Sequence, residues 1–245
     1  MTLNAMMIPA TGGLPSLPSL SSLGPLVLDF DTNRAEELFT FRGATDFVSA
    51  YADASPEGND GVQTTESRQV EYFSSVSELG GAPGVLGIYA AGTYLKISGM
   101  SEAADDWTVL SAHHEIASAS QQRIAGWLTG WARIIHDDAS GNSEYYANAH
   151  GASAAKVSDA AQVFVWELKA TNQGRVRRNG VDLDTGGTYA QTALGGTTAG
   201  LLAAHNGNHA FNGYVNRVAI FRGTLSANDL LLGERIMAAP IGVVI

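Results

Sequence analysis

Short apolar segments separated by turn-forming residues recur along most of this chain, and this spacing limits the folds open to it. The segments "DWTVLSAHHEI", "AQVFVWELKA" and "YVNRVAIF" carry the β-branched and aromatic residues typical of strands. "RVRRNGVDLD" is predicted to be a hairpin, because Asn179-Gly180 tolerates the positive φ angles of a type I′ turn. With 28 glycines and only 16% charged residues, the chain suits many tight turns better than a helical bundle. We therefore predict an all-β protein, an antiparallel β-sandwich or jelly roll, from Leu26 to Phe221.

The residues after the last predicted strand carry a specific helix-start signal. Ser226 is a good N-cap, and Asp229 can reach back to it as the capping partner. Leu225 and Leu230 occupy the two positions of a hydrophobic staple, and Pro240 prevents continuation of a helix. We predict one short C-terminal helix that begins near Ser226.

The first segment, Met1–Pro25, is uncharged and repeats leucine, proline and serine. Prolines remove backbone donors and favour extended geometry, so the segment is neither a helix nor a central strand. We predict an extended N-terminal arm over residues 1–25 and one jelly-roll domain over residues 26–245. The arm has spaced leucines that suit an apolar groove on a neighbouring subunit, and we expect them to mediate assembly: Leu14, Leu17, Leu20 and Leu23. The alternative is a disordered tail.

Charge and composition exclude several classes of partner. The formal net charge is −10, from 14 basic and 24 acidic residues, so nucleic acid and anionic membrane surfaces are not expected partners. No apolar run approaches the length of a membrane span. Cysteine is absent, which excludes disulfides and thiol chemistry. The first basic residue is Arg34, so we expect no secretory signal.

Two stretches of the C-terminal half resemble a known family. "FNGYVNRVAIFRGTLSANDL" is similar to the closing element of laminin G-like domains, members of the concanavalin A-like lectin and glucanase superfamily. "VFVWELKATNQGRVRRNGVDL" resembles the central strand and hairpin of those domains. The resemblance extends from about Tyr94 to Ala238. It implies a concanavalin A-like jelly roll in which the helix packs across the edge of the sandwich after the final strand.

An enzymatic function is the first hypothesis to consider, because that superfamily contains glucanases. Those enzymes carry an acidic strand of the form Glu-x-Asp-x-x-Glu, and retaining hydrolysis needs two carboxylates on one face. This chain has no such run. Glu66 and Glu71 are five apart, which predicts opposite faces of a strand, and Glu167 stands alone. We therefore expect a protein without catalytic activity.

One polar stretch, "HNGNHAFNG", offers amide and imidazole groups that suit sugar hydroxyls. Its candidate glycan- or partner-binding residues are His205, Asn206, Asn208 and His209. The same residues suit a polar turn equally well.

Two tryptophans form a second candidate surface. Trp127 and Trp131 are four apart in "QRIAGWLTGWARIIHDD", which we predict to be one long strand with both rings on one face. The rings could stack on sugars or on a partner. The alternative is burial in the core.

The turn "HDDASGN" supplies oxygen atoms that suit calcium. Its candidate metal ligands are Asp137, Asp138 and Asn142, and some laminin G-like domains bind calcium at a loop rim. A polar hairpin turn is the alternative, and no other cofactor is expected.

One basic cluster interrupts this acidic sequence. Arg175, Arg177 and Arg178 lie on the predicted hairpin, either as a solvated face or as a contact with an acidic neighbour in a homo-oligomer.

These features together favour a non-enzymatic structural protein of a bacteriophage virion. Laminin G-like domains resemble modules of phage head and tail proteins, and virion components reach the outside without an export signal. We expect a head-decoration or tail-associated protein at the virion surface, made in the host cytoplasm. Its arm would dock on neighbouring virion subunits, and its jelly roll is a candidate binder of host surface glycans. The alternatives are a free lectin, with or without calcium, and a divergent glycoside hydrolase.

Overall fold

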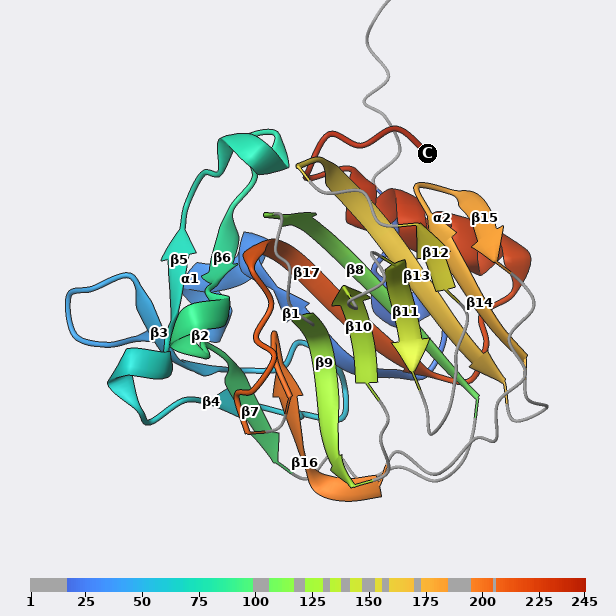
Figure 1. The fold of residues 1–245 in the computed structure, drawn as a ribbon. Helices are drawn as coiled ribbons and strands as arrows, with labels where there is room; N and C mark the ends of the chain where they lie inside the picture. The colour runs from blue at the N-terminus through green and yellow to red at the C-terminus, as the bar shows by residue number, and fades with distance from the viewer. Residues whose placement is uncertain are drawn as a thin grey trace, which may run out of the picture.

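Two antiparallel β-sheets packed face to face form the body of the molecule (Figure 1). The computed structural model describes residues 17–98, 106–116, 122–129, 133–137, 142–146, 153–155, 159–169, 173–184, 195–204 and 206–245. The predicted all-β antiparallel sandwich is confirmed. Within the described ranges, no helix has the length and apolar character needed to cross a membrane.

The first sheet is built around the longest strands of the chain. Its strands lie in the order β1–β17–β8–β13–β14–β15. Strand β6 pairs with β17 on the same edge as β1, next to β1 along that edge. The strands are β1 (Leu26–Asp31), β6 (Gly84–Gly87), β8 (Trp107–Glu115), β13 (Ala161–Lys169), β14 (Gln173–Arg178), β15 (Val181–Asp184) and β17 (Gly213–Arg222). Strand β17 is therefore central, which explains why the sequence marks it so clearly.

The second sheet contains shorter strands in the order β2–β3–β4–β7–β16–β9–β10–β11–β12. They are β2 (Phe39–Phe41), β3 (Phe47–Tyr51), β4 (Gly61–Val62), β7 (Leu95–Ser98), β9 (Gln122–Thr129), β10 (Arg133–Asp137), β11 (Asn142–Tyr146), β12 (Ser153–Ala155) and β16 (Gly195–Leu201). Strand β5 (Val70–Phe73) pairs with both β3 and β6, and so connects the two sheets.

Two helices and several 3-10 turns complete the described structure. They are α1 (Ala35–Leu38), α2 (Ala227–Ala238), η1 (Leu20–Ser22), η2 (Thr32–Arg34), η3 (Glu66–Arg68), η4 (Ser77–Leu79) and η5 (Tyr89–Ala91). The predicted helix start is confirmed, because the Ser226 hydroxyl accepts a hydrogen bond from the backbone N–H of Asp229 at 3.2 Å.

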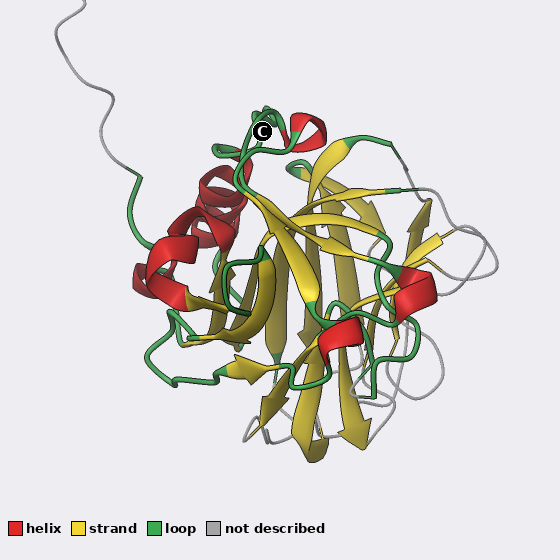
Figure 2. Cartoon of the chain, turned by 90° about the vertical axis from the view of Figure 1, so that its left-hand side faces the viewer, coloured by secondary structure: helices red, strands yellow, loops and turns green. Residues whose placement is uncertain are grey.

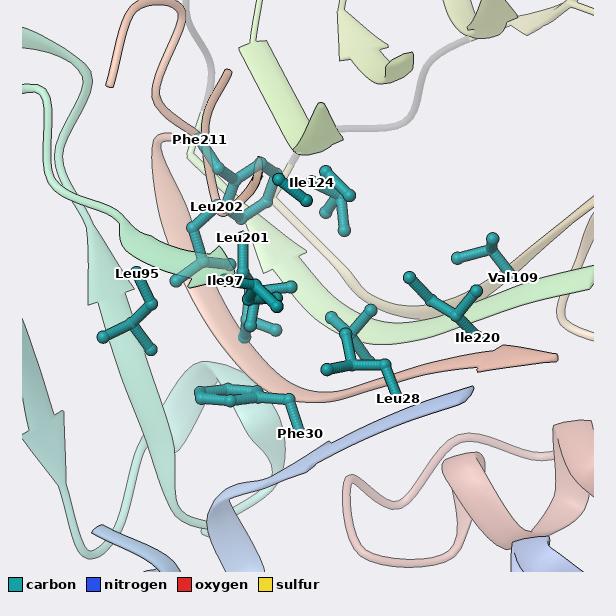
Figure 3. Close-up of a cluster of buried hydrophobic side chains, with 14 of the residues drawn as sticks. Leu28, Phe30, Leu95, Ile97, Val109, Ile124, Leu201, Leu202, Phe211 and Ile220 are labelled. Atoms are coloured by element: carbon teal, nitrogen blue, oxygen red, sulfur yellow. The ribbon is translucent and has the colours of Figure 1, made fainter. Parts of the chain in front are cut away.

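The main core lies between the two sheets. Alternate residues of each strand point inward, so Val218 and Ile220 of β17 enter this core, as predicted. Figure 3 shows Ile220 and Leu28 of the first sheet near Ile97 and Leu201 of the second. All these side chains are almost completely buried, and their removal from water is the main force that holds the sheets together.

A second core lies on the outer face of the first sheet. Ala219 and Phe221 of β17 point to this side, together with Leu110 of β8 and Val165 of β13. Helix α2 lies against β8 and β13 and covers these residues (Figure 2). The resemblance had implied a helix across the edge of the sandwich, which is wrong: the helix covers a sheet face. Strands β8, β13 and β17 therefore bury both of their faces.

The end of the predicted arm joins this second core. Leu20 is only 1% exposed and Leu23 is also buried, and both lie in the cluster formed with helix α2. Full burial of one leucine contributes roughly 1.5–3 kcal/mol. These two leucines thus stabilise their own domain. Leu17 is 47% exposed, and Leu14 lies outside the described residues.

The segment predicted as one long strand around Trp127 is in fact a pair of strands. Strand β9 ends at Thr129 and β10 begins at Arg133, and the two run antiparallel, with Arg133 opposite Gly126. The prediction of one continuous strand is therefore wrong, and the predicted pairing of the Trp127 and Trp131 rings lies outside the described residues. Gly130, which directly follows the last residue of β9 in the sequence, is the sequence signal for the break between the two strands.

Candidate functional site

Two neighbouring hollows open on either side of turn η5 and share Ala91 as a common wall. The Phe47 hollow has a volume of about 600 Å³ and is lined by residues that include Arg42, Phe47, Glu66, Glu71 and Ile88. The Arg68 hollow has a volume of about 480 Å³ and is lined by Arg68, residues 90–92 and residues 207–209. Both volumes lie in the range of small-ligand sites.

The polar stretch before β17 forms one wall of the Arg68 hollow. Gly207 has a φ of +81° and lies so close to the ring of Tyr94 that a Cβ atom there would come within 2.7 Å of it. His209 also has a positive φ, of 54°. Only glycine fits the first position, and the chain reverses sharply as a result. The reversal presents Asn208 and His209 to the hollow.

Backbone hydrogen bonds hold this wall in place. The N–H of Arg123 in β9 donates to the carbonyl of His209 at 2.9 Å, and the N–H of Ala204 donates to the carbonyl of Asn208 at 2.9 Å. The side chain of Asn206 accepts from the N–H of Asn208 at 3.1 Å. Asn208 and His209 therefore sit on a loop that is fixed to the second sheet.

Turn η3 supplies the opposite wall and the charged group of the Arg68 hollow. The Arg68 side chain is exposed and donates from Nη1 to the backbone carbonyl of Asn206 at 3.2 Å. Its own carbonyl accepts from the N–H of Tyr94 at 3.1 Å. Arg68 thus connects η3 to the loop that follows β16.

A pair of buried glutamines fixes turn η3 from below. Gln69 is 4% exposed, and its amide Nε2 donates to the carbonyl of Gln63 at 2.9 Å. The Gln63 amide in turn donates to the carbonyl of Tyr94 at 3.2 Å and accepts from the N–H of Thr65. These bonds surround the turn with satisfied backbone groups, so Arg68 projects from a rigid base.

The Phe47 hollow has a different chemical character. Arg42 lies over the ring of Phe47, 5.0 Å from its centroid, and forms an ion pair with Glu66 at 3.0 Å. Glu71 of β5 lines the same hollow. The sequence placed Glu66 and Glu71 on opposite faces of one strand, which is wrong: Glu66 belongs to turn η3, and both carboxylates line one hollow.

The structure brings part of the predicted glycan site together. Asn208 and His209 line the Arg68 hollow, and the carbonyl of Asn206 accepts the Arg68 hydrogen bond. His205 and Trp131 lie outside the described residues, as does the side chain of Trp127. The glycan role of these residues stays a prediction.

The predicted calcium ligands fall mainly outside the described structure. Asp137 ends β10 and Asn142 begins β11, so the hairpin places them at the same end, but their side chains and Asp138 lie outside the described residues. Among the residues that are described, no group of three or more histidines, cysteines or carboxylates is placed to hold a metal ion.

The basic cluster on the β14–β15 hairpin has partners within its own chain. Arg177 contacts the buried carboxylate of Glu234 in α2 at 2.9 Å and Asp182 at 2.7 Å. Arg175 pairs with Asp182 at 2.7 Å and with Glu167 at 3.2 Å. Arg178 follows on the same strand. An assembly role for this cluster stays a prediction, and Arg177 links the hairpin to helix α2 through Glu234.

Sequence reasoning missed the residues that give the two hollows their character. Arg68 occurs in "TESRQVEY", and Arg42 occurs in "TFRGATDF", and neither stretch contains a recognised motif. The hydrogen bond from Arg68 spans 138 positions of the chain. The only available signal was the position of each arginine at a junction between a strand and a turn.

Comparison with known proteins supports the fold. No protein-family model matches the chain, and no curated protein matches it by sequence. Domain 4 of AbnA, a GH43 extracellular arabinanase from Geobacillus stearothermophilus, in complex with arabinotriose, is similar to it with a TM-score of 0.59 at 12% identity. That match covers 85% of this chain and 97% of the domain.

Two toxin domains are similar in the same way. The binding domain of Paraclostridial Mosquitocidal Protein 1 has a TM-score of 0.60 at 8% identity, and the match covers 89% of this chain and 53% of that one. The binding domain of botulinum neurotoxin DC, in complex with SialylT, has a TM-score of 0.51 at 10% identity, with 89% and 52% covered. The chain thus spans about half the length of these two proteins. At such low identity, the likeness establishes a β-sandwich fold.

Proposed function

We propose that this protein is a non-catalytic carbohydrate-binding module that holds its ligand in the Arg68 hollow. The observation that carries the proposal is the convergence of guanidinium, imidazole and amide groups on rigid walls of one hollow: Arg68, His209 and Asn208. Such groups donate hydrogen bonds to sugar oxygens, and rigid walls reduce the entropy lost on binding.

The adjoining Phe47 hollow gives the ligand room to extend. Its wall contains the half-buried ring of Phe47 and the exposed side chain of Ile88, which suit the apolar faces of sugar rings. Similar sandwiches occur in complex with arabinotriose and with SialylT. That likeness is consistent with the proposal but concerns the fold.

The arrangement of the two carboxylates that line the Phe47 hollow favours binding over hydrolysis. Glu66 forms an ion pair with Arg42 at 3.0 Å, so one of the two carboxylates of the Phe47 hollow is already engaged within the protein. Glu71 lines the same hollow without an ion pair to any described residue. A retaining mechanism needs two carboxyl groups in separate roles. We therefore propose that bound saccharide is held and not cleaved.

We also propose that the protein is part of a bacteriophage virion. The supporting features are the uncharged sequence of the arm and the exposed side chain of Leu17. We propose that residues 1–17 contact a neighbouring virion subunit, and that the sandwich is displayed outward. Gel filtration and particle-binding assays on a chain that starts at Pro18 would detect this role as a loss of assembly with folding retained.

A glycan array followed by calorimetry on the strongest hit tests the binding function. Asn208→Ala should weaken binding about tenfold, because it removes hydrogen-bonding groups from the hollow. Asn228→Ala is a matched control, since Asn228 is exposed on α2 and lines neither hollow. Absence of any saccharide ligand on the array, or equal affinity for both variants, would contradict the proposal. Incubation of the hit with protein should release no shortened product.

A further inference from the structure

The two hollows differ in charge, although they share a wall. In the described part of the chain, the Arg68 hollow is lined by one guanidinium, one imidazole and no carboxylate. The Phe47 hollow is lined by two carboxylates and one guanidinium. In a chain with 24 acidic and 14 basic residues, a hollow free of carboxylates is a specific arrangement.

The charge of Arg68 is not used by the fold. Its side chain donates one hydrogen bond, to the carbonyl of Asn206, and makes no ion pair with a described residue. Glu66 lies two positions earlier in the same turn, but it is paired with Arg42. The remaining N–H groups of the Arg68 guanidinium can therefore bind an anion. A guanidinium fork matches the planar geometry of a carboxylate, with which it can form two parallel hydrogen bonds.

The charge of Glu71 acts in the opposite sense. Glu71 has no ion pair to a described residue, and its hollow adjoins the Arg68 hollow through Ala91. A second acidic group on the ligand would come to lie near this carboxylate, where like charges repel. The two hollows thus favour a ligand that is negative at one end and neutral at the other.

We propose, building on the carbohydrate-binding function above, that the ligand is a saccharide with a single acidic sugar. Its carboxylate binds Arg68 in the Arg68 hollow, and its neutral sugars lie along the Phe47 hollow. Glu71 excludes polyanionic chains. Arg68 is then the anchor for the acidic sugar, and Glu71 is a specificity determinant that acts by repulsion.

The test uses the full-length protein and the strongest array hit that carries one carboxylate, alongside the same glycan with that carboxylate reduced to an alcohol. Reduction of the glycan and Arg68→Ala should each weaken binding by about tenfold or more, and together by little beyond either alone. The affinity of Arg68→Lys should lie between those of the wild type and Arg68→Ala, because lysine keeps the positive charge but cannot form two parallel hydrogen bonds with a carboxylate. Arg235→Ala removes one exposed charge on α2 and should change nothing.

A heparin oligosaccharide provides the polyanion. Wild-type protein should bind it weakly, and Glu71→Gln should raise that affinity severalfold, with the affinity for the mono-acidic glycan less affected. Equal binding of the acidic and reduced glycans would overturn this inference and leave the carbohydrate-binding function intact. Tight heparin binding by the wild type, unchanged in Glu71→Gln, would overturn the role of Glu71. Absence of every saccharide from the array hits would instead overturn the proposed function and this inference together.

Discussion

Two arginines of this chain lie in opposite environments, one buried and ion-paired and the other exposed. Arg177 of β14 is buried beneath helix α2 and bonds to the carboxylates of Glu234 and Asp182 and to the carbonyl of Gly180. Arg68 of η3 is exposed and donates one hydrogen bond, to the carbonyl of Asn206, at the rim of a hollow. The same type of side chain therefore stabilises the fold at Arg177 and remains exposed at the rim of a hollow at Arg68.

The difference follows from how each region is closed. Helix α2 covers the outer face of the first sheet, and Glu234, at 0% exposure, points from the helix toward the hairpin. Burial alone would lower the pKa of Arg177, but the hydrogen bond and charge of Glu234 outweigh it, so the pKa of Arg177 is raised. No helix covers the described turns around Arg68, and its charge stays in water. The covered region should thus be sensitive to substitution, and the open one tolerant.

Glu234→Ala should have the largest effect on stability. It leaves Arg177 without its buried partner and removes the acceptor for the N–H of Gly180, at a cost of about 3–5 kcal/mol. Denaturant unfolding followed by tryptophan fluorescence measures this loss. Asp182→Ala is the matched control, because Asp182 is an exposed partner of the same arginine and should cost less than about 1 kcal/mol. Equal effects of the two variants would mean that the buried pair does not hold the helix.

Leu20→Ala should have the next largest effect. Leu20 lies in the second core, and its truncation leaves a cavity under helix α2 that costs about 2–4 kcal/mol. The exposed Leu17 provides the control, and Leu17→Ala should change the free energy of unfolding by no more than about 0.5 kcal/mol. Similar unfolding midpoints for both variants would show that the chain before β1 contributes nothing to the domain.

Ser226→Ala should destabilise by about 0.5–2 kcal/mol through loss of the N-cap. Thermal unfolding by circular dichroism gives the magnitude, and Ser226→Asp, which keeps an acceptor, should recover most of it. An unchanged midpoint for Ser226→Ala would contradict the capping role and would make the ion pair the main attachment of α2.

These residues also show what the sequence alone can predict. Ser226 and the Asn179-Gly180 turn were predictable, because a cap and a tight turn depend on residues a few positions apart, and both form. The position of helix α2 on a sheet face was not predicted. A signal for it existed in "VFVW", residues 163–166, whose unbroken apolar run fits a strand that is covered on both sides.

The candidate site was less predictable than the fold. Asn208 and His209 were found from their polar side chains alone, and they line a hollow as a result of the reversal at Gly207. Arg68 was missed because its place in the lining of the hollow depends on turns η3 and η5 and the loop at 206–209 meeting in space. Such a meeting is set by strand pairing over long separations, which residue spacing does not encode.

Arg68→Ala should affect stability as little as Leu17→Ala, and it completes the comparison of the two arginines. The side chain is exposed and donates one hydrogen bond, so the free energy of unfolding should change by no more than about 0.5 kcal/mol. Arg177→Ala, measured beside it, should lower the free energy of unfolding several times more. This substitution leaves the Glu234 carboxylate buried without its charged partner. If Arg68→Ala proved as damaging as Arg177→Ala, the contact with Asn206 would be a structural link, and a loss of ligand binding in that variant would follow from unfolding. If Arg68→Ala keeps its stability while its affinity for the glycan falls, Arg68 acts in ligand recognition. The stabilising ion pair with helix α2 is made by the other arginine, Arg177.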